Sequence, residues 1–409
     1  MKSKQKILKV LLLTTSFPLT RESRSGIFIQ KMINQLPDNV QVTVLTPDSA
    51  SAALQPSGEY SVLPFRYAPK HWQQLAHGSG GIMAALSRNR LLLLLLPSFL
   101  CSNLLVCCYA ARKMDILHAN WSINGVIAGI VGLILGKPVL TTLRGSDVNL
   151  METSALMRRL VHFCLRFSNV VVTVSPSLQQ KLTERFPQYR AKIGVICNGI
   201  DQAFFAAEDI QEEVEEGCSA SGQGKRSLRF LYVGNLVPGK GVDIILQAAA
   251  SLPSENWQLD IIGDGPDRKA LEGYCQKQGL ESRVTFRGSA PPEEIPHAMA
   301  QADVFVFASF AEGRPNVVLE AMAVGLPVIA GAIPAVSDLI ESGQQGLLFP
   351  PGDVRALAGH MTSLLQDSLA RQRLGNKARQ SLASSGLSWP ESARHYLSVY
   401  TDVVEGECS

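Results

Sequence analysis

Short apolar runs alternate with longer segments of helical periodicity along most of the chain. In the first half these runs predict strands at 6–15, 41–47, 61–68, 115–120, 138–143 and 170–175. The intervening helices are expected to begin near residue 27 and to lie near 83–113 and 124–135. Strands that alternate with helices are typical of βαβ units, which form a parallel sheet with helices on both faces. Ligands bind such sheets at the carboxyl ends of the strands.

The same alternation begins again after an acidic and then Gly/Ser-rich segment at 208–226, which has too few apolar residues to build a core. Strands are predicted at 228–236, 257–265, 284–289, 304–309, 327–331 and 346–353, with helices between them. The chain thus reads as α/β, with two doubly wound domains at 1–205 and 206–385. An amphipathic helix within 386–409 is expected to pack back on the first domain.

Two apolar runs raise the question of a membrane. The first, near the N-terminus, resembles a signal peptide, but no small-residue cleavage site follows it, so we favour a buried first strand. The second, Leu91 to Ala111, is long enough to span a bilayer and has basic flanks. Pro97 and several polar residues interrupt it where the fold needs a helix. A helix that packs on the sheet, or dips into a membrane surface, is favoured over a true span.

The length and charge of the chain narrow the class of protein. A chain of 409 residues exceeds one ordinary core, and its 46% hydrophobic content is that of a globular protein. Its eight cysteines form no C-x-x-C pair and no zinc-binding spacing, which indicates reduced thiols in a cytoplasmic protein. Residues 1–205 carry 22 Lys and Arg against 9 Asp and Glu, whereas the remainder carries 16 against 26. The basic half is expected to face an anionic lipid surface or a phosphate-bearing substrate, unless the charges are merely solvated.

The stretch from Ala311 to Gly331 combines two carboxylates with an apolar helix. Pro315 is suited to the first turn of that helix, whose free backbone N–H groups would begin at the carboxyl edge of a parallel sheet. A phosphate is the natural occupant of such a position. Glu320 lies among apolar residues, so its carboxylate needs donors, which sugar hydroxyls or a basic neighbour would supply. Glu312 precedes the helix and would approach the same ligand.

The segment that contains these residues resembles a known enzyme family. The spacing from Glu312 to Glu320 resembles the E-x₇-E signature of retaining glycosyltransferases of the GT-B fold, and the continuation is similar to glycosyltransferase family 4. Further motifs agree: VGNLVPGKG, IIGDGP, ADVFVFASFAEG, GLLFPPGD and VICNGID. The resemblance covers nearly the whole chain. It implies two Rossmann-like domains that face each other across a cleft.

The resemblance also implies roles for single residues. Glu312 would lie beside the donor sugar, Glu320 would bind the nucleotide ribose, and Lys240 would bind the donor diphosphate and stabilise the leaving group. The remaining donor-binding positions are predicted at Gly26, Asn235, Gly313, Arg314, Asn316 and Val317. Gly26 is predicted to allow a close backbone approach to the donor phosphate or the acceptor. His118 is predicted as catalytic, and Arg144 and Asp147 as acceptor-side residues.

The sequence departs from the family pattern at several positions. Asn235 stands where the family often has Arg, and Arg314 stands where an apolar residue is usual, which offers a compensating charge. Ala335 replaces a frequent Glu. In the first half, Asn120 occupies the second position of a frequent His-x-His pair, and Arg144 replaces a frequent His. These changes predict unusual donor affinity or donor identity.

The resemblance implies a metal-independent, retaining transfer of a hexose from a nucleotide diphosphate sugar to an acceptor hydroxyl. No D-x-D metal motif is present in the sequence, and no cofactor is expected. The motifs look most like bacterial enzymes of capsule, exopolysaccharide or O-antigen synthesis, which act on glycan or polyprenyl-linked acceptors. The expected location is cytoplasmic, peripheral at the inner face of the membrane, and no nucleic-acid partner is expected. A nucleotide-sugar epimerase of the same fold and a non-catalytic nucleotide-sugar-binding scaffold are the alternatives.

Overall fold

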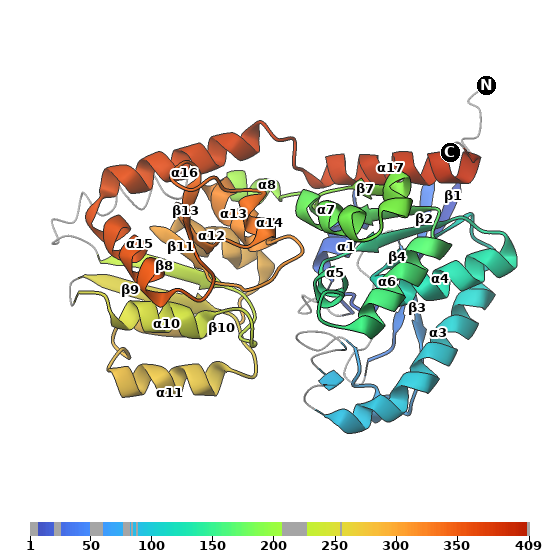
Figure 1. Cartoon of the computed structure of the whole chain (residues 1–409), viewed down its shortest axis with the longest axis horizontal. Coiled ribbons are helices and arrows are strands. Elements are labelled where there is room, and N and C mark those ends of the chain that lie inside the picture. Colours follow the sequence, from blue (N-terminus) through green and yellow to red (C-terminus); the bar gives the residue numbers. More distant parts are fainter. Residues whose placement is uncertain are drawn as a thin grey trace. The chain divides into compact units, whose positions relative to one another are not determined.

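The computed structural model describes residues 7–19, 26–49, 60–76, 82, 85–86, 89–206, 227–253 and 256–406. It divides into two compact units (Figure 1). Unit 1 contains residues 1–199 and 389–409, and unit 2 contains residues 200–388. The sequence placed the corresponding boundaries a few residues away, at 205 and 385. The last segment of the chain returns to unit 1.

Unit 1 is built on a seven-stranded parallel sheet in the order β3-β2-β1-β4-β5-β6-β7. Its strands are β1 (Leu8–Leu13), β2 (Val40–Pro47), β3 (Ser61–Phe65), β4 (Ile116–Asn120), β5 (Val139–Leu143), β6 (Val170–Thr173) and β7 (Ile193–Val195). The apolar run near the N-terminus is β1, which pairs with both β2 and β4 at the centre of the sheet. The strand interpretation is therefore confirmed. The sequence did not predict β7, because three residues are too few to show a periodicity.

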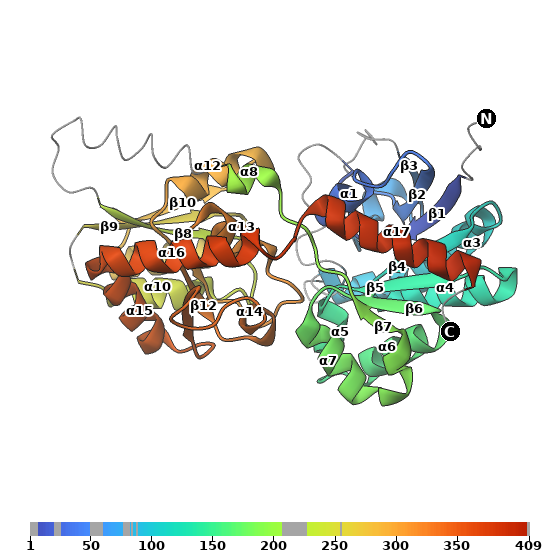
Figure 2. The ribbon, with the colours of Figure 1, turned by 90° about the horizontal axis from the view of Figure 1, so that it is seen from above.

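Helices cover both faces of this sheet (Figures 1 and 2). They are α1 (Ile27–Ile33), α3 (Leu96–Ala111), α4 (Ser122–Leu135), α5 (Ser146–Leu150), α6 (Ala155–Phe167), α7 (Pro176–Arg185) and α17 (Trp389–Glu405). Short 3-10 turns add η1 (Lys70–Trp72), η2 (Arg90–Leu95) and η3 (Pro187–Lys192). Helix α17 buries Trp389, Tyr396 and Tyr400 against the apolar side chains of β1 and β2. The C-terminal helix is thus part of the core of unit 1.

Unit 2 contains a six-stranded parallel sheet in the order β10-β9-β8-β11-β12-β13. The strands are β8 (Leu228–Val233), β9 (Trp257–Ile262), β10 (Val284–Gly288), β11 (Val304–Phe307), β12 (Val328–Gly331) and β13 (Gly346–Phe349). All six correspond to predicted strands. The order reverses between β8 and β11, and ligands of doubly wound sheets bind at such a switch point.

The helices of unit 2 pack on both faces of the sheet around two apolar clusters. They are α8 (Gln202–Phe205), α10 (Val242–Ala250), α11 (Arg268–Gln278), α12 (Ile295–Ala300), α13 (Asn316–Val324), α14 (Pro334–Ser337), α15 (Val354–Gln366) and α16 (Ser368–Ala383), with the 3-10 turn η4 (Pro292–Glu294). Helix α13 buries Leu319 and Met322 in one of these clusters. Because α13 follows β11 in a parallel sheet, the N-terminus of this helix lies at the carboxyl edge of the sheet.

Candidate functional site

The loops that follow β8 and β11 meet at the switch point of unit 2. The Phe310 N–H donates to the Gly239 carbonyl at 2.9 Å. Gly241 has a φ of +67°, and a Cβ there would lie 2.2 Å from the Ala308 carbonyl oxygen. Only glycine fits this position, because both the left-handed backbone and the close contact exclude a side chain. The last glycine of the P-G-K-G motif thus lets the two loops touch.

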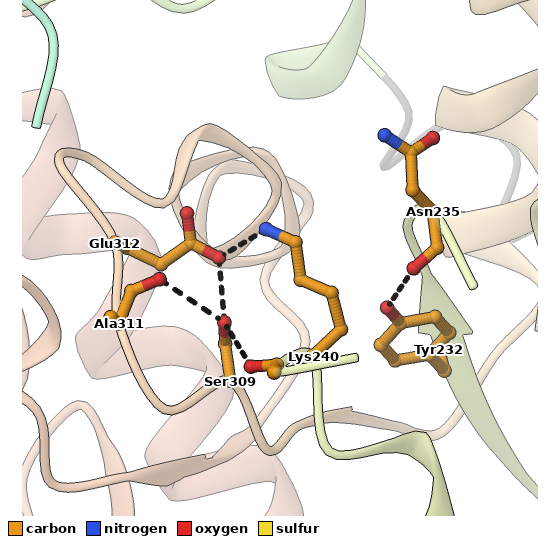
Figure 3. A network of polar contacts seen from close by, with 7 residues as sticks. Tyr232, Asn235, Lys240, Ser309, Ala311 and Glu312 are labelled. Carbon is orange, nitrogen blue, oxygen red and sulfur yellow. Dashed lines mark hydrogen bonds and ion pairs between the residues drawn. The ribbon is translucent and has the colours of Figure 1, made fainter. Parts of the chain in front are cut away.

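Lys240 and Glu312 form an ion pair between these loops (Figure 3). The Lys240 Nζ lies 2.6 Å from Glu312 Oε1, and the side chains are 28% and 15% exposed. The hydroxyl of Ser309 donates to the same carboxylate oxygen at 2.8 Å. Ser309 is fully buried, so its hydroxyl contacts the carboxylate from the protein interior. A charge-assisted hydrogen bond of this kind fixes the orientation of the acceptor.

Tyr232 and Asn235 lie in the same part of unit 2. The Tyr232 hydroxyl donates to the Asn235 carbonyl at 3.2 Å, as Figure 3 shows. Burial raises the pKa of Tyr232, and the Glu312 carboxylate raises it further, so the phenol stays protonated. The side chain of Asn235 is exposed, and it follows β8 in the loop that also carries Lys240. A ligand at the switch point would therefore be within the range of this loop.

The predicted donor-binding residues after Glu312 form the entry to α13. Gly313 is buried, whereas Arg314, Asn316 and Val317 are half-buried. The helix begins at Asn316 rather than at the predicted Pro315, whose φ and ψ of −81° and 82° are not helical. Glu320 is half-buried, and its neighbours Leu319 and Ala321 are buried, as expected for a residue among apolar side chains. Ala335 is buried in the short helix α14.

Gly26 precedes α1 in unit 1 and has a φ of +75°. A Cβ at this position would lie 2.1 Å from the Ser16 carbonyl oxygen. The contact that demands glycine is therefore with the chain itself. This is a different reason from the predicted approach of a ligand, although the loop still follows β1 at the carboxyl edge of the sheet.

Arg144 follows β5 at the same edge and makes a network of its own. Its guanidinium donates to Asn120 Oδ1 at 2.8 and 3.0 Å and to Asn198 Oδ1 at 3.0 Å. It also lies 4.6 Å above the centre of the Phe28 ring. Burial lowers the pKa of Arg144, but an arginine remains charged at neutral pH. The Asn120 amide nitrogen is buried and has no hydrogen-bond partner among the residues that the structure describes.

His118 lies in β4 and is fully buried, which gives no geometric support to the predicted catalytic role. Its Nδ1 lies 2.7 Å from the Tyr400 hydroxyl, and its Nε2 lies 2.9 Å from Thr142 Oγ1. Burial, followed by the charge of Arg144, lowers the pKa of His118 to about 3. The imidazole is therefore neutral and joins α17 to the sheet. Its side chain points into the α17 interface, so the catalytic role stays a prediction that this geometry does not support.

Asp147 is buried, and its carboxylate serves the chain itself. Oδ2 accepts from the Ser122 N–H at 2.8 Å, and Oδ1 accepts from the Val148 N–H at 3.0 Å. Burial raises the pKa of Asp147, and these backbone donors oppose the rise. The first contact satisfies an amide at the start of α4, as capping residues do. The Asp147 carboxylate thus has a structural role that could replace the predicted role on the acceptor side.

Two family models match successive parts of the chain. The model described as Glycosyltransferase Family 4 matches residues 25–204, and the model described as Glycosyl transferases group 1 matches residues 219–381. The two matches fall on units 1 and 2 and together cover most of the chain. The chain belongs to the family 4 type of glycosyltransferases.

Individual relatives of this glycosyltransferase have diverse names. It is 27% identical to the N-acetyl-alpha-D-glucosaminyl L-malate synthase of Bacillus anthracis over 301 residues, which cover 72% of this chain and 77% of the relative. It is 29% identical to a glycogen synthase of Mycobacterium tuberculosis over 308 residues, with 72% and 70% covered. The two relatives are thus named for different products.

Solved structures agree in fold. Anabaena HepE in complex with UDP and glucose has a TM-score of 0.72 at 20% identity, with 96% of this chain and 99% of that chain covered. The sucrose-phosphate synthase of Thermosynechococcus elongatus has a TM-score of 0.77 at 21% identity, with 98% and 100% covered. The predicted GT-B fold of two Rossmann-like domains is confirmed.

Two residues beside the predicted positions, Ser309 and Trp121, were not singled out in the sequence. Ser309 escaped notice because a serine after an apolar strand has no charge to mark it, although its place three residues before Glu312 was a usable signal. Trp121 has a φ of +67°, which is strained for a residue with a side chain, and its ring lies 6.4 Å from that of Phe28. Asn120 precedes Trp121 in the chain, and the predicted residue Arg144 lies over the Phe28 ring.

The remaining features of the glycosyltransferase carry less chemistry. Among the residues that the structure describes, no three His, Cys, Asp or Glu side chains gather as metal ligands would. A surface cavity of about 380 Å³ in unit 1 is lined by Met151, Glu152, Arg158, Lys181, Glu184 and Arg185. Its cations are largely engaged, since Lys181 pairs with Glu152 at 3.0 Å and Arg158 donates to backbone carbonyls.

Proposed function

We propose that this enzyme transfers a hexose from a nucleotide diphosphate sugar to an acceptor hydroxyl, with retention of the anomeric configuration. The observation that carries the proposal is the Lys240–Glu312 pair, held by Ser309 at the switch point of unit 2. A cation there would meet the donor diphosphate, and a carboxylate beside it would meet the sugar hydroxyls. The UDP and glucose of the HepE complex suggest the same class of donor.

Each residue would then have a defined task. The Lys240 ammonium would stabilise the charge that develops on the diphosphate as the bond from the sugar C1 to the phosphate oxygen breaks. The N–H groups at the start of α13 would add to this stabilisation. Glu312 would position the sugar, and Glu320 would accept hydrogen bonds from the ribose. The acceptor oxygen would bond to C1 on the same face, and its proton would pass to the leaving phosphate oxygen.

We propose that no metal ion takes part, because Lys240 and the helix N-terminus supply positive charge where a cation would otherwise be needed. The proposal predicts transfer that is insensitive to chelators. If an excess of EDTA abolished the reaction and Mg²⁺ restored it, this part of the proposal would be wrong.

We further propose a glycan or lipid-linked acceptor in cell-surface polysaccharide synthesis, with the enzyme at the inner face of the cytoplasmic membrane. The basic balance of residues 1–205 and the apolar segment Arg90–Ala111 support this location. Arg144 and Asp147 are proposed on the acceptor side. Arg144 is the stronger candidate, because it lies with Asn120 and Phe28 at the carboxyl edge of the sheet.

Thermal unfolding with UDP-, GDP- and ADP-sugars tests the donor class. A ligand at 100 times its Kd should add about 2.7 kcal/mol of stability. We expect a shift with one nucleotide class, which Lys240→Ala and Glu320→Ala should reduce. Proton NMR of the product then reports the anomeric configuration. Conversion of the donor sugar without an acceptor would indicate an epimerase, and tight binding without turnover on any acceptor would indicate a scaffold.

A further inference from the structure

The segment Arg90–Ala111, formed by η2 and α3, has two unlike sides. One side packs on the sheet through Phe99 and Cys107. Polar contacts also fix it, since Ser102 Oγ donates to the Arg66 carbonyl at 2.6 Å and the Asn103 amide donates to Asn124 at 3.1 Å. The segment is the one candidate span among the described residues, and its most apolar 18-residue window has a mean hydropathy of 2.3 with only 17% of that window buried. One side of the helix thus belongs to the core of unit 1.

The other side presents apolar side chains to solvent. We name the α3–α4 apolar face by six exposed residues on η2, α3 and the end of α4: Leu91, Leu94, Leu105, Tyr109, Leu133 and Ile134. Leu105 is 69% exposed and Leu133 is 74% exposed. Helices α3 and α4 lie side by side, and each runs into a strand of the same parallel sheet, so their C-terminal ends lie at the same edge. Tyr109 and Leu133 lie near these two C-terminal ends, so we treat the exposed apolar residues of both helices as one face.

The charges around this face have one sign. From Tyr60 to Ser146 the only acidic residue is Asp115, and its carboxylate accepts the Lys9 backbone N–H at 2.8 Å. The same stretch contains eight lysines and arginines. Of these, Arg90 precedes the apolar helix, Arg112 and Lys113 follow it, and all three are exposed. Apolar side chains framed by cations match the chemistry of an anionic lipid surface.

We propose that the α3–α4 apolar face inserts into the headgroup region of a bilayer that contains anionic phospholipid. The proposal rests on the proposed function in one respect, because a lipid-linked acceptor would have to be reached at the membrane. A dimer formed through this face is less suitable, because it would bring the cations Arg90, Arg112 and Lys113 of the two copies close together, where they would repel. Unit 2 offers no comparable face, as Phe310 and Leu369 are its exposed large apolar residues among those described.

Co-sedimentation with vesicles tests the proposal on the full chain. The vesicles contain phosphatidylcholine and phosphatidylglycerol at about four to one, with pure phosphatidylcholine as the comparison. We expect the double variant Leu105→Glu/Leu133→Glu to bind anionic vesicles at least about tenfold more weakly, because two leucines leave the bilayer and two anions oppose it. The matched control is Leu369→Glu in unit 2, which replaces a leucine that is 75% exposed and should bind as the unchanged protein does.

A charge variant separates the electrostatic contribution. Arg112→Gln/Lys113→Gln should weaken binding to anionic vesicles by about fivefold per charge at low salt, and leave binding to pure phosphatidylcholine unchanged. All these residues are exposed, so thermal unfolding should show no change in folding.

Three results would overturn the proposal. The first is that the double glutamate variant binds vesicles as well as the unchanged protein does. The second is that the unchanged protein does not bind vesicles at low salt. The third is a concentration-dependent dimer that the double glutamate variant abolishes, with no vesicle binding. Transfer to a water-soluble acceptor, measured without vesicles, reports the proposed enzymatic function separately. If the unchanged protein showed no such transfer, the result would count against the proposed function. The membrane proposal would still be decided by the vesicle assay.

Discussion

The two units use polar residues at the carboxyl edges of their sheets in different ways. In unit 2 the loops after β8 and β11 bring Lys240 and Glu312 to 2.6 Å, and both side chains keep some exposure. In unit 1 His118 is bonded to α17 and Asp147 to the start of α4, and of the three predicted polar residues at this edge Arg144 alone is not fully buried. A polar residue at a strand end is thus a site residue only where its partners leave room for a ligand.

The largest expected effect comes from removing the cation of unit 2. Lys240→Ala should lower kcat by about a thousandfold or more, since one preorganised group that stabilises developing charge contributes roughly 3–4 kcal/mol to catalysis. The ion pair is part-exposed, so thermal unfolding should change little. Steady-state kinetics with a saturating donor give the measurement. A kcat within threefold of the unchanged enzyme would mean that the pair is structural, and the contrast between the units would fail.

The next effect concerns the positioning residue Ser309. Ser309→Ala removes the donor to Glu312 Oε1, and a hydrogen bond to a charged group is worth about 1.5–3 kcal/mol. We expect kcat to fall by about ten- to hundredfold, with a smaller change in the KM for the donor. Ser309→Thr keeps the hydroxyl and serves as the matched variant. If the alanine and threonine variants lost activity equally while remaining folded, packing rather than the hydroxyl would explain Ser309.

His118 tests the other side of the comparison. His118→Ala should lower the free energy of unfolding by about 2–4 kcal/mol, because it opens a cavity and removes the partner of the Tyr400 hydroxyl, whereas Thr142 keeps the Tyr396 hydroxyl at 3.2 Å. The kcat of the folded variant should stay within about threefold. A folded variant with a hundredfold lower kcat would restore the catalytic role that the sequence predicted.

The same histidine predicts a pH dependence of stability. Its pKa falls from the ordinary 6.5 to about 3 in the folded protein, so between these values the unfolded chain binds the proton and the folded chain does not. The contribution of neutral His118 to the free energy of unfolding is complete above pH 6.5. It is lost as the pH falls toward 3, at no more than about 1.4 kcal/mol per pH unit. Urea unfolding of the unchanged protein and of His118→Gln should diverge in this range. Parallel pH profiles would contradict the assignment.

The sequence predicted the fold of unit 2 more fully than the fold of unit 1, for physical reasons. The six strands of unit 2 are short, mainly apolar runs, and five of them end at or just before a glycine or proline. Glu312, Lys240 and Asn235 were all located from motifs. Strand β7 was missed because it is three residues long. The burial of His118 was missed because its partner Tyr400 lies 282 positions away, and no local pattern marks a contact at that separation.

The smallest expected effect concerns the exposed Asn235 beside β8. The family often has arginine at this position, and the Asn235 side chain has no charge to offer a diphosphate. Asn235→Arg should therefore bind the nucleotide diphosphate about three- to tenfold more tightly, as one added cation at a part-solvated site contributes about 1 kcal/mol. Asn235→Gln controls for side-chain length, and isothermal titration measures both. A variant that gains nothing would place the diphosphate out of reach of position 235, and Arg314 would then be the cation to replace next.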